Sequence, residues 1–541
     1  MLKTICAKAE KLLIVTEDVA RGLESQVVAR IVQWALVGVL IAFGLLSAPL
    51  FMRQLSYIVS LNDDVGYYDS YFLYDVLHFQ KTGVIYRDLS LPPYVPAAYS
   101  PALYVLYSLP GRIVEFANPI LGPRIVALAA FILCIGIVIS IIRTLIPVRF
   151  AWMWGVLLIC STADIWPWIL QIRADFPGIC FTLLTIRLLL LRSPWAVYLS
   201  AICAGLATQF KFVFVSALVT GVLWLFVRRQ WKDLAGFAIL GTVFSVGLYF
   251  LYSLREPGMF SQIFAVSPGI IDLKGDLRII YTTVREPAVL LAVVGLPRGA
   301  YRIGQRGALI VIFAAISFLI AGLTDLHVGG AGNYFLEPLF AVVPLAVLGV
   351  LRLMALVRQN VLLGIFFTTL FGVHFLIPRA LEVRRQLGPE AFPSVRSRNE
   401  SFLLVEQALR GTRIFATIPR LAVLDPAPSL TEPYIFSYLQ MLGKINPQPI
   451  LERIRDSEFD IVITLTHAEM WRGVPLIGRN LHDTITASYE PLCELPGNLG
   501  FTWLMQLPRQ PHDGTNALAQ RLANIGCAPV IPDHGASTLR W

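Results

Sequence analysis

The stretch from 120 to 142, ILGPRIVALAAFILCIGIVISII, indicates the class of fold to which this chain belongs. It holds one charged residue, Arg124, in a run long enough to cross the roughly 30 Å hydrocarbon core of a bilayer as a helix. The whole composition agrees, because 56% of the 541 residues are hydrophobic and 15% are charged, whereas about a quarter of a soluble domain is charged. The chain is therefore predicted to be an all-α polytopic membrane protein.

Eleven apolar runs are predicted to cross the membrane as helices. Several are shorter than the ~20 residues of a full span, which a tilted or buried helix tolerates. The region 195–227 can also be interpreted as one helix instead of two, so the count is open by one or two. The runs lie at 31–51, 120–142, 148–163, 176–191, 195–208, 212–227, 233–253, 286–297, 307–323, 334–351 and 361–377.

The distribution of Lys and Arg gives the orientation of these helices. If the segment 1–30 is cytoplasmic, the inside connections carry twelve Lys and Arg residues and a single acidic residue, Asp233. The short outside connections carry half as many, mixed with acidic residues. This bias predicts an N-inside topology. It also assigns the net charge of +9 to cytoplasmic loops, so no nucleic-acid partner is expected.

Two segments lack the membrane pattern. The outside loop 60–118 is rich in Tyr, Pro and charge, and its stretches 71–79 and 103–114 are predicted to be interfacial helices. The tail 379–541 alternates short β-like runs, at 421–424, 459–465 and 501–507, with helical stretches such as 431–442 and 448–455. This alternation indicates a small C-terminal α/β domain. Because the last helix ends outside, we expect this domain to be extracytoplasmic. The transmembrane domain is then 31–378, in the cytoplasmic (inner) membrane.

The first candidate site is the stretch NDDVGYYD at 62–69, directly after the first apolar run. Adjacent carboxylates such as Asp63 and Asp64 can divide two tasks: one accepts a proton from an attacking hydroxyl or amine, and the other holds a divalent cation. Tyr67 could stack on a sugar or anchor the loop among lipid headgroups. The alternative is a solvated turn that caps the next helix.

A second candidate site is the stretch QIRADFP at 171–177. Arg173 can hold a phosphate bidentately, which Lys would do only as a point charge. Lys211, between two apolar runs on the same side, could also bind an anion. In the alternative interpretation, Asp175 simply begins a helix, Arg173 pairs with it, and the long cationic side chains extend to the headgroups.

The third candidate site is the stretch TDLHVGGAGNYFLE at 324–337. Its glycines allow a ligand to approach the backbone, or they form an ordinary turn. Glu337 lies one helical turn inside an apolar run, where an ionisable group usually faces a cavity or a partner. Asn333 and His327 are further polar candidates, although a lone His is more often a hydrogen-bonding group than a metal ligand.

All three stretches are predicted to lie on one membrane face, and this joint placement favours a shared site. The sequence contains no GxxxxGK[ST], GxSxG or HExxH motif and no CxxC pairing. The signatures of nucleotide hydrolysis, serine hydrolases and zinc proteases are therefore lacking.

Several short motifs occur in a recognisable order. They are the acidic pair that opens the first outside loop, GVIYRD at 83–88, PP at 92–93, YSP at 99–101, QIRAD at 171–175 and GNY at 332–334. In this order they resemble the polytopic GT-C glycosyltransferases, particularly bacterial members similar to protein O-mannosyltransferases and the aminoarabinose transferases. Ala174 stands where the family has proline in an Arg-Pro-Asp element. The likeness covers about residues 30–380.

The resemblance implies a GT-C-like fold and a glycosyltransferase that moves a hexosyl or pentosyl group from a polyprenyl-phosphate donor to a glycan, lipid or protein acceptor at the outer face. Asp63 or Asp64 would be the catalytic base or a metal-associated carboxylate, and Arg173 with Lys211 would hold the donor phosphate. Relatives differ in their use of a divalent metal, so a metal stays open and no other cofactor is expected. The further substrate-binding candidates are Tyr67, Asp175, His327, Asn333 and Glu337.

Two other functions compete with this one. A lipid or solute transporter or flippase would line a path with the same charges, but transporters usually place them near the midplane in repeated halves. Here the charges gather at one face and no internal repeat is seen, which favours the enzyme. A non-catalytic assembly protein, whose tail recruits partners, is the third interpretation.

Overall fold

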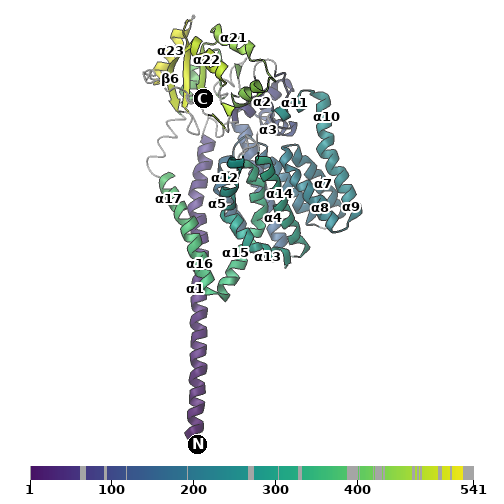
Figure 1. Ribbon diagram of the computed structural model, residues 1–541, viewed down its shortest axis with the longest axis vertical. Helices are drawn as coiled ribbons and strands as arrows, with labels where there is room; N and C mark the ends of the chain where they lie inside the picture. The colour runs from purple at the N-terminus through teal and green to yellow at the C-terminus, as the bar shows by residue number, and fades with distance from the viewer. Residues whose placement is uncertain are drawn as a thin grey trace.

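The computed structural model describes residues 2–527 apart from a set of short segments. Helices fill the part of the chain that precedes the tail, and a small sheet with its own helices lies at one end of the helical bundle (Figure 1). The segments outside the described residues are 61–68, 90–93, 117, 192, 266–272, 302–303, 327–331, 387–399, 401, 418–419, 421–428, 431–432, 466–469, 472–473, 476–477, 497–501 and 512–513.

The predicted membrane helices are present. Each of the eleven apolar runs coincides with a helix, and among the described residues six helices are long and apolar enough to span a bilayer, or seven if one bent pair counts as a single span. The polytopic helical class is confirmed, whereas the count of eleven spans is not. The six are Gln26–Arg53, Leu121–Leu145, Trp231–Arg255, Gln305–Asp325, Gly332–Gln359 and Val361–Arg384.

The first helix is much longer than its apolar run. α1 covers Leu2–Ser60, which corresponds to about 90 Å of helix. Its N-terminal part projects from the bundle as a single helix, at the end of the molecule opposite the sheet (Figure 1).

The remaining helices of the membrane part follow in chain order. Two of them continue through a π-helical turn, α9 into α10 and α16 into α17. The bounds are α4 Leu121–Leu145, α5 Ala151–Ser161, α6 Asp175–Leu189, α7 Pro194–Thr208, α8 Ser216–Val227, α9 Trp231–Thr242, α10 Leu248–Arg255, α12 Leu273–Val284, α13 Pro287–Tyr301, α14 Gln305–Asp325, α15 Leu336–Gln359, α16 Val361–Phe371 and α17 Ile377–Gln386.

Close packing between α13 and α15 fixes the centre of the bundle. The two helices touch backbone to backbone at Gly295 and Gly349: a Cβ added at Gly349 would lie 1.8 Å from the carbonyl oxygen of Leu291. Small residues of this kind let helix backbones approach closely inside a membrane. α12 meets α13 at a bend of 70°, so this pair is a broken span or a re-entrant loop.

The first outside loop forms a layer of short helices over the bundle. α2 (Asp69–Thr82) and α3 (Pro101–Ile113) match the predicted interfacial stretches. The segment between them is tied down by residues near α11 (Met259–Ala265). Glu256 Oε2 accepts hydrogen bonds from the backbone N–H groups of Ile85 at 3.0 Å and Tyr86 at 2.8 Å, and Gln262 Oε1 accepts one from Ala97 at 2.9 Å.

The tail forms the predicted α/β domain. Its five-stranded sheet has the order β2-β1-β3-β7-β6, in which β1 pairs in parallel with β2 and β3 while β7 pairs antiparallel with β3 and β6. The elements are β1 Ile414–Ala416, β2 Ser429–Leu430, α20 Pro433–Met441, α21 Gln448–Arg455, β3 Ile461–Leu465, β4 Met470–Trp471, β5 Val474–Pro475, α22 Arg479–Ser488, β6 Tyr489–Pro496, β7 Thr502–Pro508 and α23 Thr515–Asn524.

This domain packs against the first outside loop. Tyr71, on α2, donates a hydrogen bond of 2.6 Å to the carbonyl oxygen of Thr417, directly after β1. The Tyr94 ring lies 5.1 Å from that of Phe436 on α20. The end of β1 is therefore joined to α2, the first helix of this loop.

Candidate functional site

Asp175 is the centre of the polar group at the outer-loop end of the bundle. It is the first residue of α6 and is 1% exposed. A carboxylate in the first turn of a helix interacts favourably with the helix dipole, and Pro177 fits the same turn because its missing N–H needs no partner there. The sequence therefore begins α6 with a buried negative charge.

Lys211 supplies the positive charge that this carboxylate needs. It lies between α7 and the short η2 turn, Phe212–Val215, and its Nζ is 3.3 Å from Asp175 Oδ1. The same Nζ lies 3.7 Å from the centre of the Tyr334 ring, a cation–π contact. Burial works against the charged form of Lys211, but Asp175 and Tyr334 outweigh it and raise the pKa. Lys211 is therefore held as a cation in a nearly closed site.

Asn333 completes the contacts of Asp175. It lies in the η4 turn, Gly332–Phe335, and its Nδ2 donates to both carboxylate oxygens of Asp175, at 3.1 and 3.0 Å. Three connections that are far apart in the chain thus converge on one carboxylate. The structure brings together the predicted residues Asp175, Lys211 and Asn333.

Arg173 adds a second cation beside this group. Its guanidinium stacks over the Trp168 ring at 4.9 Å and donates through Nε to Gln171 Oε1 at 2.8 Å. The Tyr107 hydroxyl donates to the backbone carbonyl of Arg173 at 2.7 Å, which fixes the turn before α6. Arg173 and Lys211 are the two cations of this group, and a guanidinium with several N–H donors is suited to an anion.

Tyr99 and Tyr334 are the residues that the sequence analysis did not select. Burial raises the pKa of the Tyr99 phenol, and the positive charges of Lys211 and Arg173 oppose that rise. Its ring lies 4.9 Å from that of Phe72. Both tyrosines stand inside quoted motifs, YSP and GNY, but the pattern of a motif does not tell an interfacial tyrosine from one that faces a site.

The first outside loop reaches the same group. Asp69, at the start of α2, accepts a hydrogen bond of 3.1 Å from the backbone N–H of Ile172. The predicted residues Asp63, Asp64 and Tyr67 lie outside the described residues, as does His327. Their roles stay predictions.

Glu337 lies close by but has its own partner. It is 2% exposed in the first turn of α15, and its Oε1 accepts a hydrogen bond of 2.6 Å from the hydroxyl of Ser216, at the start of α8. An ionisable group at this depth was predicted to face a cavity or a partner. Here Glu337 has a partner, and it joins two helices beside the group around Asp175.

The sequence left the use of a divalent metal open, and the described part of the chain contains no cluster of metal-binding side chains. There, no group of three or more His, Cys, Asp or Glu side chains could hold a metal ion. The acidic pair Asp63 and Asp64 lies outside the described residues.

Comparison with solved structures shows which proteins have this fold. ArnT from Cupriavidus metallidurans in the apo state has 12% sequence identity and a TM-score of 0.55, over 85% of this chain and 97% of that chain. The same protein bound to undecaprenyl phosphate gives 14% identity and a TM-score of 0.55, over 86% and 99%. An apo oligosaccharyltransferase from Archaeoglobus fulgidus has 11% sequence identity and a TM-score of 0.48, over 90% of this chain and 77% of that chain.

The two similarities to ArnT confirm the predicted resemblance at the level of the fold. The chain has the fold of ArnT over nearly the whole length of that protein. No protein-family model matches the chain, and no curated protein matches it either.

Proposed function

We propose that this protein is a membrane glycosyltransferase that moves a hexosyl or pentosyl group from a polyprenyl-phosphate donor to a glycan, lipid or protein acceptor at the outer face of the membrane. The observation that carries the proposal is the convergence of Lys211, Arg173 and Asn333 on one end of the bundle. It is supported by a fold shared with ArnT, which has been solved with undecaprenyl phosphate.

The two cations suit the leaving group of this reaction. When the glycosidic C–O bond breaks, its electron pair stays on the lipid phosphate, and the negative charge there increases. Arg173, with its planar set of donors, would hold the phosphate oxygens, while Lys211 would contribute a fixed positive charge. Both are oriented before the donor arrives, Lys211 by Asp175 and Arg173 by Trp168 and Gln171.

The acidic pair of the first outside loop would supply the base. Asp63 or Asp64 would take the proton from the acceptor hydroxyl or amine as it attacks the anomeric carbon, and the other carboxylate would orient a cation. The contact of Asp69 with Ile172 supports this role, because Asp64 precedes Asp69 by five positions. An extended chain covers at most about 3.6 Å per residue, or roughly 18 Å over that stretch.

The proposed topology places the tail on the extracytoplasmic side of the inner membrane. Cys493 and Cys527 are joined in a disulfide within the tail, with their Cα atoms 5.5 Å apart. Disulfides persist in oxidising compartments and are rare in the cytosol. This bond therefore supports an extracytoplasmic α/β domain.

The test is a complementation experiment read by mass analysis of cell-envelope glycans and glycolipids. A strain that lacks the protein should lose one sugar modification, and the wild-type protein should restore it. Asp63→Asn and Asp64→Asn are each made, together with the double variant. The matched control is Glu115→Gln, an exposed acidic residue of the same loop.

We expect the double variant to lose the sugar modification although the protein is inserted and folded, and Glu115→Gln to retain it. An unchanged glycan profile in all three Asp variants would refute the proposed base. If the strain that lacks the protein keeps all of its glycans and glycolipids unchanged, the glycosyltransferase itself is refuted.

A further inference from the structure

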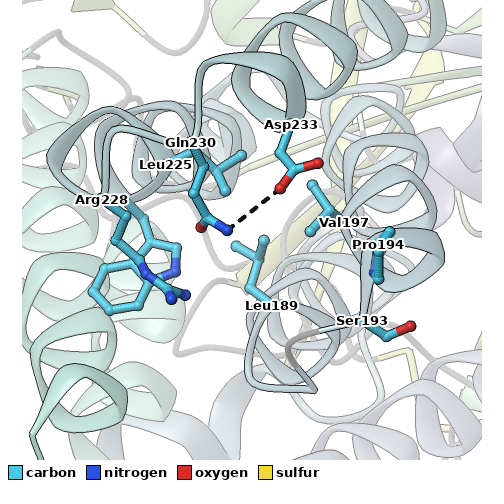
Figure 2. A pocket seen from close by; sticks show the side chains of 9 residues that line it. Leu189, Ser193, Pro194, Val197, Leu225, Arg228, Gln230 and Asp233 are labelled. Atoms are coloured by element: carbon cyan, nitrogen blue, oxygen red, sulfur yellow. Dashed lines mark hydrogen bonds between the residues drawn. The ribbon is translucent and has the colours of Figure 1, made fainter.

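A cavity lies at the opposite end of the bundle from the candidate site. α6 begins at Asp175 and ends at Leu189, and α8 begins at Ser216, after the η2 turn that follows Lys211, and ends at Val227. Their far ends therefore lie one helix length away from the candidate site. The cavity there has a volume of ≈ 110 Å³, several times what one ordered water needs. It is lined by Leu189, Ser193, Pro194, Val197, Trp224, Leu225, Arg228, Gln230 and Asp233 (Figure 2).

The charges of this cavity are of both signs. Figure 2 shows Arg228 on one side and Asp233 on the other, with Gln230 between them. The Arg228 guanidinium lies 5.4 Å from the centre of the Trp224 ring. Gln230 Nε2 donates to Asp233 Oδ2 at 3.4 Å, and none of the described residues bonds the other carboxylate oxygen. Asp233 is also the single acidic residue among the predicted inside connections, whose other charged residues are all Lys or Arg.

The backbone holds these side chains in place. After α8 the chain turns sharply, with the N–H of Gln230 bonded to the carbonyl of Leu225 at 3.0 Å and the N–H of Arg229 to that of Phe226 at 2.9 Å. This turn requires one residue in the left-handed backbone conformation, in which glycine is usual. Arg229 adopts that conformation, with φ 56°. The turn therefore keeps Arg228 and Gln230 at the cavity at some cost in backbone strain.

Two exposed tryptophans beside the cavity indicate that it lies at the level of lipid headgroups. Trp195 and Trp231, next to two of its lining residues, are 59% and 57% exposed. Tryptophan is enriched at the boundary between the hydrocarbon core and water, and basic pockets between helices on the cytoplasmic side bind lipid headgroups. A lipid is therefore the ligand that can reach this cavity from its own surroundings.

We propose that this cavity binds the headgroup of an aminophospholipid of the phosphatidylethanolamine type. Arg228 takes the phosphate through its N–H donors, and Asp233 takes the primary ammonium as a hydrogen-bond acceptor. A choline headgroup has no N–H to give to Asp233, and a glycerol headgroup has no positive charge. The presence of one carboxylate and one guanidinium on facing walls thus selects a headgroup with both charges and a free ammonium.

The first test uses the wild-type protein and needs no variant. The full-length chain is purified in detergent and offered phosphatidylethanolamine, its N-methyl and N,N-dimethyl derivatives, phosphatidylcholine and phosphatidylglycerol of matched acyl chains, and retained lipid is counted by native mass spectrometry. Retention should fall as methyl groups are added, by at least tenfold between the first lipid and phosphatidylcholine. Equal retention of the whole series overturns the proposal.

The second test determines whether Asp233 recognises the ammonium group of the lipid. Asp233→Asn should abolish the preference for phosphatidylethanolamine over phosphatidylcholine, Asp233→Glu should keep it, and Lys232→Gln, an exposed neighbour outside the lining, should leave it unchanged. If Asp233 acted only on the helix dipole of α9, Asp233→Asn would lower the melting temperature and keep the lipid preference, and that result overturns the assignment. Glycerophosphoethanolamine, which has the same charges without acyl chains, should not displace the bound lipid at equal concentration, and displacement would overturn the choice of a lipid.

Discussion

Asp175 shows what a sequence can and cannot give at the level of one residue. Its position at the start of a helix was one of the two interpretations of the sequence, because Asp and Pro in a first turn are a strong local signal. Its partner was not foreseen. The sequence suggested Arg173, two positions away, whereas the fold brings Lys211 Nζ to 3.3 Å from Asp175 Oδ1. Local chemistry fixes the helix start, whereas a contact over 36 positions depends on how α6 and α7 pack.

Loss of the Lys211 charge should destabilise the protein. Both members of the pair are buried, and removal of one partner of a buried ion pair costs about 3–5 kcal/mol because the other charge is left uncompensated. We expect Lys211→Met to lower the unfolding free energy by about that amount. The double variant Lys211→Met/Asp175→Asn should recover part of this loss. A melting series in detergent measures both, and strictly additive effects of the two substitutions would show that the residues do not interact.

At the level of elements, the sequence located the helices well and their irregularities poorly. Each apolar run became a helix, because a bilayer requires every backbone group to be bonded within its own segment. The π-helical turn at Val243–Gly247 was not foreseen. Gln209 explains it: its Nε2 donates to the carbonyls of Phe244 at 3.1 Å and Ser245 at 2.7 Å. Such a turn depends on a side chain from another helix, which no periodicity reveals.

The contact between α13 and α15 should tolerate no side chain at Gly349. A methyl group there would overlap the Leu291 carbonyl oxygen, which is backbone and cannot rotate away. Overpacking of this kind costs about 1–3 kcal/mol or more, so Gly349→Ala should lower the melting temperature. Gly322→Ala in α14 is the matched control, since nothing lies within 4 Å of its added Cβ, and it should be neutral or slightly stabilising. Equal behaviour of the two variants would contradict the packing.

The ion pair of the first outside loop should make stability depend on pH. Arg87 Nη2 lies 2.7 Å from Asp75 Oδ1, yet burial raises the pKa of Asp75 to about 7 in spite of that partner. Between about pH 4 and 7 the folded protein keeps a proton that the unfolded chain releases, so the unfolding free energy falls as the pH rises. The side chain introduced by Asp75→Asn does not titrate, so the melting temperature of this variant should change less over that pH range than that of the wild type. Identical slopes for variant and wild type would contradict the raised pKa.

For the whole molecule, the tail was the least predictable part. Two of its strands and two of its helices were expected from their patterns, but the predicted β-like run 421–424 lies outside the described residues, and the pairing of Cys493 with Cys527 does not follow from two thiols in a sequence. The docking of this domain on α2 through Tyr71 and Thr417 is equally a property of the fold. Long-range contacts of this kind have no local signal.

The disulfide gives a test of the side on which the tail lies. Cells are treated with a membrane-permeable alkylating reagent before lysis, and the protein is then unfolded in the same reagent. Labels should appear on Cys6, Cys134, Cys160, Cys180 and Cys203 and be absent from Cys493 and Cys527. Removal of the bond with Cys493→Ser should cost about 4 kcal/mol, as expected for a loop of 34 residues. Labels on both tail cysteines would place the domain in a reducing compartment and contradict the topology.

The central claim is that the cations gathered at the outer helix ends hold a polyprenyl phosphate, and retention of undecaprenyl phosphate by the purified protein tests it most directly. Native mass spectrometry should show one bound lipid on the wild type. Because hydrogen bonds to charged groups contribute about 1.5–3 kcal/mol, Arg173→Gln should weaken binding by at least tenfold. Arg112→Gln, an exposed arginine at the end of α3, should bind as the wild type does. No retained lipid on the wild type, or equal retention by Arg173→Gln, would contradict the account.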